Sequence, residues 1–120
     1  MVPYLEYNFF MKIKNIFRSI PTDLKEEVFE NIFSNNNIQI ERIISKGHTS
    51  PKEGEKEWYD QEKDEWVIVL QGEARLSFFD APECVLKSGD YVHIPAHTLH
   101  KVSWTSSQEE TIWLAIHYKG

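Results

Sequence analysis

The sequence predicts an all-β domain, an antiparallel sandwich or barrel, preceded by one N-terminal α-helix. Apolar and polar residues alternate in short segments from residue 38 to the end of the chain, which is the pattern of half-buried strands. Turn-forming residues separate these segments, for example Gln71-Gly72 and Lys87-Ser88-Gly89-Asp90. Short strands at regular spacing behind a single helix are typical of antiparallel sandwiches and barrels.

The expected strands are 38–45, 65–71, 74–79, 83–86, 91–94, 99–104 and 111–118. In the last strand, Ile112 and Leu114 lie on one face, whereas Trp113 and Ala115 lie on the other. Both faces are therefore apolar. We expect one of them to face the barrel interior and the other to be covered by the helix, the N-terminal arm or a second subunit.

A helix is expected over residues 22–34. Its apolar residues recur at spacings of three and four, the pattern of one amphipathic helix face: Leu24, Val28, Phe29, Ile32 and Phe33. Thr22 is placed to cap the helix N-terminus, and the run Ser34-Asn35-Asn36-Asn37 would end it. We expect this helix to pack on the barrel as a lid.

The composition fits one domain. A chain of 120 residues with 41% hydrophobic and 13% aromatic residues has enough apolar surface for one compact core. We expect an N-terminal arm at 1–21 and a barrel domain with its leading helix at 22–120. The net charge of -6 argues against a nucleic-acid partner, since such proteins use clustered basic residues.

Two further features of the sequence bear on where in the cell the protein is found. Cys84 is the only cysteine, so no internal disulfide can form, and a single thiol suits a reducing compartment; we expect a cytoplasmic protein. No segment approaches the roughly 20 consecutive apolar residues of a membrane-spanning helix, so no membrane association is expected.

Two polar residues stand on strand faces that are otherwise apolar. Glu65 begins the segment 65–71 and shares a face with Val67. A buried carboxylate is costly unless it is paired, hydrogen-bonded or bound to a metal. His100 shares a face with Val102 and Trp104 in the segment 99–104. If Glu65 and His100 meet inside the barrel, they supply donors suited to a divalent metal, provided that further ligands join them.

These residues also carry a family resemblance. The sequence resembles the cupin superfamily, whose motifs are approximately G-x5-H-x-H-x3-4-E-x6-G and G-x5-P-x-G-x2-H-x3-N. Glu65 and Gly72 reproduce the end of the first motif, while Gly89, Pro95 and His100 fit the second. The resemblance covers about residues 58–104. It implies a double-stranded β-helix, also called a jelly roll or cupin barrel, and a homodimer.

The first motif lacks both of its histidines. Trp58 and Asp60 stand there under one spacing, Tyr59 and Gln61 under the other. The resemblance therefore transfers only Glu65 and His100 as metal ligands, with Asp60 as the best third ligand and Gln61 as the next. The implied cofactor is a divalent metal, Mn, Fe, Ni or Zn, with no organic cofactor. In the alternative, Glu65 and His100 pair directly in a metal-free pocket.

Other residues are candidates for the pocket wall. Trp58, Tyr59 and Trp104, the last at the N position of the second motif, could line a site for a flat or sugar-like ligand. His97 replaces the second glycine of that motif, and is either an acid-base group at the pocket mouth or an exposed loop residue. His93 and His117 lie within strands, where histidines are more often packed than functional.

Three functions remain open from the sequence. The chain is a metal-binding cupin that binds or acts on a small oxygenated molecule, a metal-free barrel that binds a small ligand or carbohydrate, or a dimeric scaffold without pocket chemistry. No catalytic residue is assigned, because no nucleophile stands near a base at a recognisable spacing.

Overall fold

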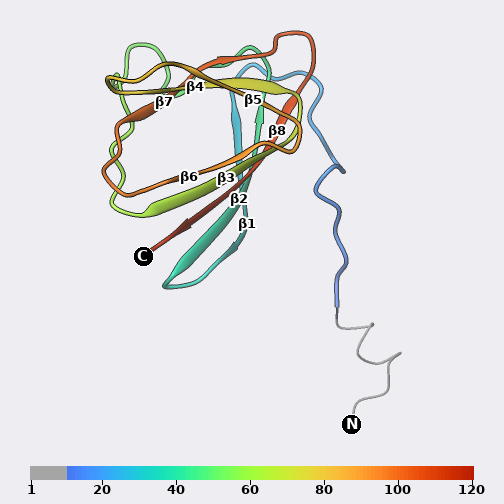
Figure 1. Ribbon diagram of the computed structural model, residues 1–120. Coiled ribbons are helices and arrows are strands. Elements are labelled where there is room, and N and C mark those ends of the chain that lie inside the picture. Colours follow the sequence, from blue (N-terminus) through green and yellow to red (C-terminus); the bar gives the residue numbers. More distant parts are fainter. Residues whose placement is uncertain (1–10) are drawn as a thin grey trace.

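The fold is a sandwich of two antiparallel sheets, seen in a computed structural model that describes residues 11–120. The strands are β1 (Val28–Ser34), β2 (Ile38–Ser45), β3 (Asp64–Gln71), β4 (Glu73–Phe78), β5 (Cys84–Lys87), β6 (Tyr91–Ile94), β7 (His100–Thr105) and β8 (Thr111–Tyr118). The large sheet has the order β1-β2-β8-β3-β6, and the small sheet has the order β5-β4-β7. Figure 1 shows the two sheets as facing layers. The all-β prediction is confirmed.

The core lies between the two sheets. Alternation along β3 sends Val67 and Val69 inward, where they are 3% and 0% exposed. They join Trp113 from β8 and Leu76 from β4 in one apolar cluster. The same alternation turns every second residue of the large sheet toward the small one, so polar residues in those positions are held inside the barrel.

The predicted helix at 22–34 is wrong, since residues 28–34 form strand β1. This strand pairs antiparallel with β2, with Val28 opposite Ile44 and Phe33 opposite Ile40. The turn that follows is a hairpin connection, in which the side chain of Asn35 accepts hydrogen bonds from the backbone N–H groups of Asn37 and Ile38. The asparagine run therefore joins two strands instead of ending a helix.

A β-bulge explains why this strand looks helical in the sequence. The register of β1 on β2 shifts between Asn31 and Phe33, so that Ile32 is an extra residue. One extra residue breaks the alternation of period two. Apolar residues before and after the bulge then recur at the three- and four-residue spacing that is typical of a helix.

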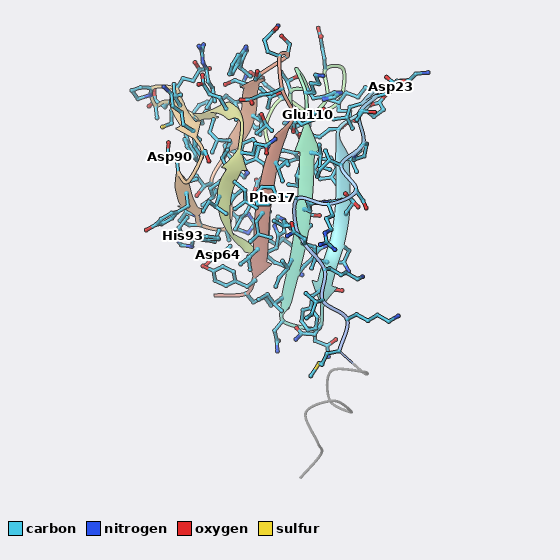
Figure 2. All side chains as sticks on the ribbon, turned by 90° about the vertical axis from the view of Figure 1, so that its right-hand side faces the viewer. Phe17, Asp23, Asp64, Asp90, His93 and Glu110 are labelled. Carbon is cyan, nitrogen blue, oxygen red and sulfur yellow. The ribbon has the colours of Figure 1, made fainter. Side chains whose placement is uncertain are left out.

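The N-terminal segment covers part of the outer face of the large sheet. Arg42, on β2, points outward and is only 7% exposed. Its guanidinium donates hydrogen bonds to the backbone carbonyls of Ile16 and Arg18, at 2.9 and 2.6 Å, and forms an ion pair with Glu30 on β1. Figure 2 shows the segment around Phe17 lying across this face. Residues 1–10 of the expected N-terminal arm lie outside the described residues.

Within residues 11–120, no helix has the length and apolar character needed to cross a membrane.

Candidate functional site

A cavity of about 220 Å³ lies between the two sheets. Its wall is made by strands of both sheets and by the loop before β3. The lining residues are Glu27, Phe29, Glu41, Ile43, Ser50, Tyr59, Gln61, Glu65, Val67, Leu76, Ile94, His100, Val102, Trp113 and His117. Aliphatic and aromatic walls with a few polar side chains are typical of small-molecule sites.

Glu65 and His100 meet across the cavity from opposite sheets. Glu65 stands on β3 of the large sheet and His100 at the start of β7 in the small sheet. His100 Nε2 lies 3.5 Å from Glu65 Oε1, and the two side chains are only 5% and 10% exposed. His100 Nδ1 lies 2.7 Å from the carbonyl oxygen of Thr98. Because a carbonyl only accepts, Nδ1 carries a proton and Nε2 is the nitrogen presented to Glu65.

A second acid-imidazole pair lies beside the first. Glu41 on β2 and His117 on β8 are joined by a 2.9 Å contact between Oε1 and Nε2. His117 also stands directly opposite Glu65 in the pairing of β3 with β8. The hydrogen bond to the Glu41 carboxylate raises the pKa of His117, outweighing the opposite effect of burial. Carboxylate and imidazole groups therefore alternate along one side of the cavity.

The loop before β3 is fastened to the strand that carries His100. The backbone N–H of Tyr59 donates to the carbonyl of His100 at 2.7 Å, and the N–H of His100 donates back at 3.2 Å. This pairing holds the Tyr59 ring with its centroid 5.5 Å from that of the His100 ring. The Tyr59 hydroxyl contacts the Ser50 hydroxyl, and burial raises the pKa of Tyr59.

Glu27 is a third carboxylate in the wall. It lies just before β1, and its Oε2 accepts a 2.5 Å hydrogen bond from the Ser45 hydroxyl. Burial raises the pKa of Glu27, although the serine hydroxyls at 45 and 50 act in the opposite direction.

Of the two candidates for a third metal ligand, the structure places Gln61 in the cavity wall and Asp60 outside it. Asp60 Oδ1 lies 2.7 Å from His97 Nδ1, and both side chains are more than half exposed. The backbone N–H of His97 donates to the Gln61 carbonyl at 2.7 Å, which fixes the two loops together. His97 has φ +60°, the left-handed conformation that suits the glycine expected there.

Side chains of residues 11–120 nowhere bring three His, Cys, Asp or Glu groups together in an arrangement that could hold a metal ion. Glu65 and His100 converge, but the contact of Asp60 with His97 directs this carboxylate away from them. The ligand set expected from the sequence therefore does not fit a metal centre in this structure.

Two predicted wall residues lie outside the cavity. Trp58 packs edge-to-face on Phe79, with ring centroids 6.0 Å apart. Trp104 is 36% exposed and stacks on the guanidinium of Arg75 at 4.8 Å. The pairing of β4 with β7 shifts register beside Trp104, so this residue does not share the face of Val102. Of the aromatic residues expected in the wall, only Tyr59 lines the cavity.

Sequence reasoning did not include Glu27, Glu41 and His117 in the site. A signal was available for two of them. Glu41 shares a strand face with Ile43, and His117 shares one with Trp113 and Ala115. Each is thus a polar residue on an inward face, as Glu65 is. Glu27 lies where a helix was expected, so strand alternation could not place it.

Trp113 adds one unpaired donor. This residue lines the cavity and is 2% exposed. Its indole Nε1–H is buried without a hydrogen-bond partner among the described residues. A buried donor without a partner is rare in folded proteins, and a bound molecule with an acceptor oxygen would satisfy it.

Comparison with known proteins agrees with this architecture. The model of the cupin domain family matches residues 47–117. A crystal structure from Ralstonia eutropha JMP134, named "putative mannose-6-phosphate isomerase", is 39% identical, covers 92% of this chain and 100% of its own, and has a TM-score of 0.83. A cupin superfamily protein from Desulfitobacterium hafniense DCB-2 is 20% identical, with 84% of each chain covered and a TM-score of 0.68; this likeness shows the fold alone.

A curated relative gives a similar result over a shorter span. The uncharacterized protein YdbB of Bacillus subtilis (strain 168) is 37% identical over 67 residues, which are 55% of this chain and 57% of the Bacillus protein. The two proteins are thus compared over little more than half of their lengths. The family model matches more than half of the chain, and the two sheets enclose the expected cavity. The chain therefore belongs to the cupin domain family.

Proposed function

We propose that this cupin binds a small oxygenated organic molecule in its barrel cavity without a bound metal ion. The observation that carries the proposal is the direct approach of Glu65 to His100, 3.5 Å apart, in the wall of an interior cavity of about 220 Å³. The two side chains give an apolar cavity a polar centre that can hold and orient a ligand.

The donors and acceptors of the wall favour a ligand with hydroxyl groups. Ionised carboxylates only accept hydrogen bonds, so Glu41 and Glu65 would accept them from ligand hydroxyls. The indole N–H of Trp113 can only donate, and would require an oxygen acceptor. A hydroxyl group both donates and accepts, and so it serves both kinds of group.

The proposal includes no metal because the possible metal ligands are not brought together around one point. A divalent metal in this fold would need Glu65, His100 and at least one more ligand. Asp60 is held outside the cavity by His97, and Gln61 would contribute only a neutral amide oxygen. Glu41 and His117 line the cavity but contact each other at 2.9 Å, and the described residues hold no group of three ligands. Glu65 and His100 approach each other directly, at 3.5 Å, and no third ligand joins them among the described residues.

The name of the Ralstonia protein mentions a sugar phosphate, and we do not extend this substrate to the present chain. A phosphate group is normally bound by Arg, Lys or clustered backbone N–H groups. Among the described residues that line the cavity, none is Lys or Arg, and three are glutamates. The wall would therefore repel a phosphate, whereas the hydroxyl groups of a sugar or polyol suit it.

Thermal unfolding tests the proposal. The protein, purified without added metal, is treated with EDTA or with Mn²⁺ and is screened against sugars, polyols, hydroxylated amines and hydroxy acids. We expect EDTA and Mn²⁺ to leave Tm unchanged and at least one compound to raise it, because binding to the folded state alone stabilises it. The shift should disappear in Glu65→Gln and persist in His93→Ala, a control on an exposed side chain.

Two results would contradict it. A fall in Tm on chelation, with stoichiometric metal in the untreated protein, would show that the site holds a metal after all. Failure of every compound class to raise Tm would remove the binding function.

We further propose that the chain acts as a cytoplasmic homodimer. The outer face of the large sheet supports a partner subunit, because β8 presents Leu114, Ile116 and Tyr118 there and all three are only half-buried. Tyr91, on β6, is 64% exposed at the edge of the same face. A second copy of the chain would cover this surface.

A further inference from the structure

The cavity wall carries more negative than positive charge. Three carboxylates line it, those of Glu27, Glu41 and Glu65, against two imidazoles, those of His100 and His117. Even with both imidazoles protonated, one negative charge is left over. No Lys or Arg is among the described lining residues. An uncompensated charge in a partly buried site is unfavourable, so a ligand that supplies a positive charge is favoured.

The excess charge is located at Glu27. Glu65 lies beside His100 and Glu41 beside His117, so each of these carboxylates has an imidazole partner. The hydrogen-bond partners of Glu27 are uncharged hydroxyls, those of Ser45 and Ser50. It is therefore the carboxylate of the wall that remains without a cationic partner.

The imidazole of His48, which is close enough to Glu27 to influence it, does not fill that role. The backbone N–H of Lys46 donates to His48 Nδ1 at 2.9 Å, so this nitrogen is an acceptor and carries no proton. His48 Nε2 lies 3.2 Å from the carbonyl of Lys25 and donates to it. Both ring nitrogens of His48 are therefore bonded to backbone groups, and no ion pair joins His48 to Glu27 among the described residues.

Nearby lysine side chains have other contacts. Lys52 pairs with Glu26 at 3.0 Å, and both side chains are more than 60% exposed. Lys56 Nζ lies 5.5 Å from the centre of the Tyr59 ring. Neither lysine is in the cavity wall. Lys25 and Lys52 share an adjoining hollow with Glu27, but neither forms an ion pair with it among the described residues. Inside the cavity, the positive charge beside Glu27 is therefore left for a ligand to supply.

Glu27 and the Glu65–His100 pair belong to one cavity that a small molecule can span. Both line the same space of about 220 Å³. The charges of Glu27 and Glu65 both act on the hydroxyl of Tyr59, which places Tyr59 within electrostatic reach of each. The aromatic ring of Phe29 also lines this space, and aromatic rings attract cations.

We infer that the ligand is a small hydroxylated amine, whose ammonium group binds at Glu27 and whose hydroxyl group binds at the Glu65–His100 pair. This inference rests on the proposed function, since it names the class of molecule that the metal-free cavity selects. The ammonium group donates to the Glu27 carboxylate, while the hydroxyl group donates to Glu65. A hydroxy acid of the same shape is excluded, because it would add a negative charge.

Four matched probes test this inference by calorimetric titration at neutral pH: aminocyclohexanol, cyclohexanediol, cyclohexylamine and hydroxycyclohexanecarboxylate. They share one ring and differ in charge and in hydroxyl groups. Aminocyclohexanol is expected to bind most tightly, about tenfold more tightly than cyclohexanediol, because its ammonium group adds a positive charge beside the Glu27 carboxylate that a hydroxyl group lacks. Cyclohexylamine should bind more weakly than aminocyclohexanol, and the carboxylate should not bind.

A charge variant locates the effect. Glu27→Gln removes one charge and keeps the shape of the side chain and one acceptor oxygen for the Ser45 hydroxyl. We expect it to weaken aminocyclohexanol binding about tenfold and to leave cyclohexanediol binding unchanged. Glu109→Gln, an identical change in the exposed loop between β7 and β8, is the matched control and should alter neither affinity.

The outcomes separate this inference from the proposed function. If cyclohexanediol binds as tightly as aminocyclohexanol, or if Glu27→Gln has no effect on the amine, the cationic ligand is disproved while a metal-free cavity for hydroxylated molecules stands. If no probe binds and EDTA lowers Tm, both proposals fail. If hydroxycyclohexanecarboxylate binds most tightly, the cavity selects an anionic ligand and the inference is wrong.

Discussion

Glu65–His100 and Asp60–His97 are carboxylate-imidazole pairs built from neighbouring stretches of sequence, and they differ in environment. The first spans 3.5 Å, with side chains 10% and 5% exposed. The second is shorter, at 2.7 Å, but its side chains are 56% and 65% exposed. Water screens the outer pair, whereas the inner pair interacts in the low dielectric of the core. Burial, more than the distance between the atoms, decides which pair contributes to stability.

Strand geometry produces this difference. Glu65 and His100 stand on strands, and the alternation of each strand turns them inward. Asp60 and His97 lie in the loops beside these strands, where no alternation fixes the direction of a side chain. The positive φ of His97 turns the chain locally and leaves its ring outside the cavity.

The largest predicted effect is on the inner pair. Replacing His100 with Ala leaves the Glu65 carboxylate buried without its partner, and we expect a loss of about 3 kcal/mol in the free energy of unfolding. Urea denaturation measures this loss. His97→Ala, the same change in the outer pair, is the matched control and should cost less than about 0.5 kcal/mol. Equal losses in the two variants would show that burial does not distinguish the pairs.

Much of the fold could be predicted from the sequence because most of its strands alternate regularly. The segment 111–118 was expected from alternation and is β8 (Thr111–Tyr118). The prediction failed where a bulge interrupts the alternation. Ile32 is the extra residue that made β1 look like a helix. A sequence pattern of period two contains no information on the position of a bulge.

Strand alternation predicts only part of the site. Alternation placed Glu65 with Val67, and the structure has both in the cavity wall. It also placed Trp104 with Val102, and a register shift between β4 and β7 separates them. The direction of Asp60 could not be predicted, because it depends on a contact with His97 from a loop distant in the sequence.

The next effect concerns pH and the second inner pair, Glu41–His117. The hydrogen bond to Glu41 raises the pKa of His117 above 6.5 in the folded state, so the folded protein holds this proton more tightly than the unfolded chain. The stabilisation is complete below the unfolded pKa and is lost as the pH rises through the folded pKa. We therefore expect stability to fall with rising pH in this window.

Glu41→Gln isolates this contribution. The variant keeps a hydrogen bond but loses its charge assistance, so it should be destabilised by about 1.5 kcal/mol at low pH and less at high pH. Urea denaturation of both proteins between about pH 5 and about pH 8 covers the range in which histidine titrates. Burial, the main cause of the raised pKa of Glu27, is common to both proteins and gives a slope of the same sign. The charge of Glu41 also raises this pKa, so its removal weakens the slope in the same direction as the change at His117. Parallel pH profiles would contradict the role of Glu41.

The smallest predicted change in stability is that of Asp60→Asn, and it tests directly whether the site holds a metal. Asp60→Asn removes the charge of the outer pair, which is screened by water, so the free energy of unfolding should change by less than about 0.5 kcal/mol. The same variant should bind the same ligands as the wild type, because Asp60 does not line the cavity. If Asp60 instead turned inward to join Glu65 and His100 around a metal, its replacement would lower Tm only in protein carrying that metal. A chelator-sensitive difference between Asp60→Asn and the wild type would thus assign Asp60 to the inner site and reverse the contrast between the two pairs.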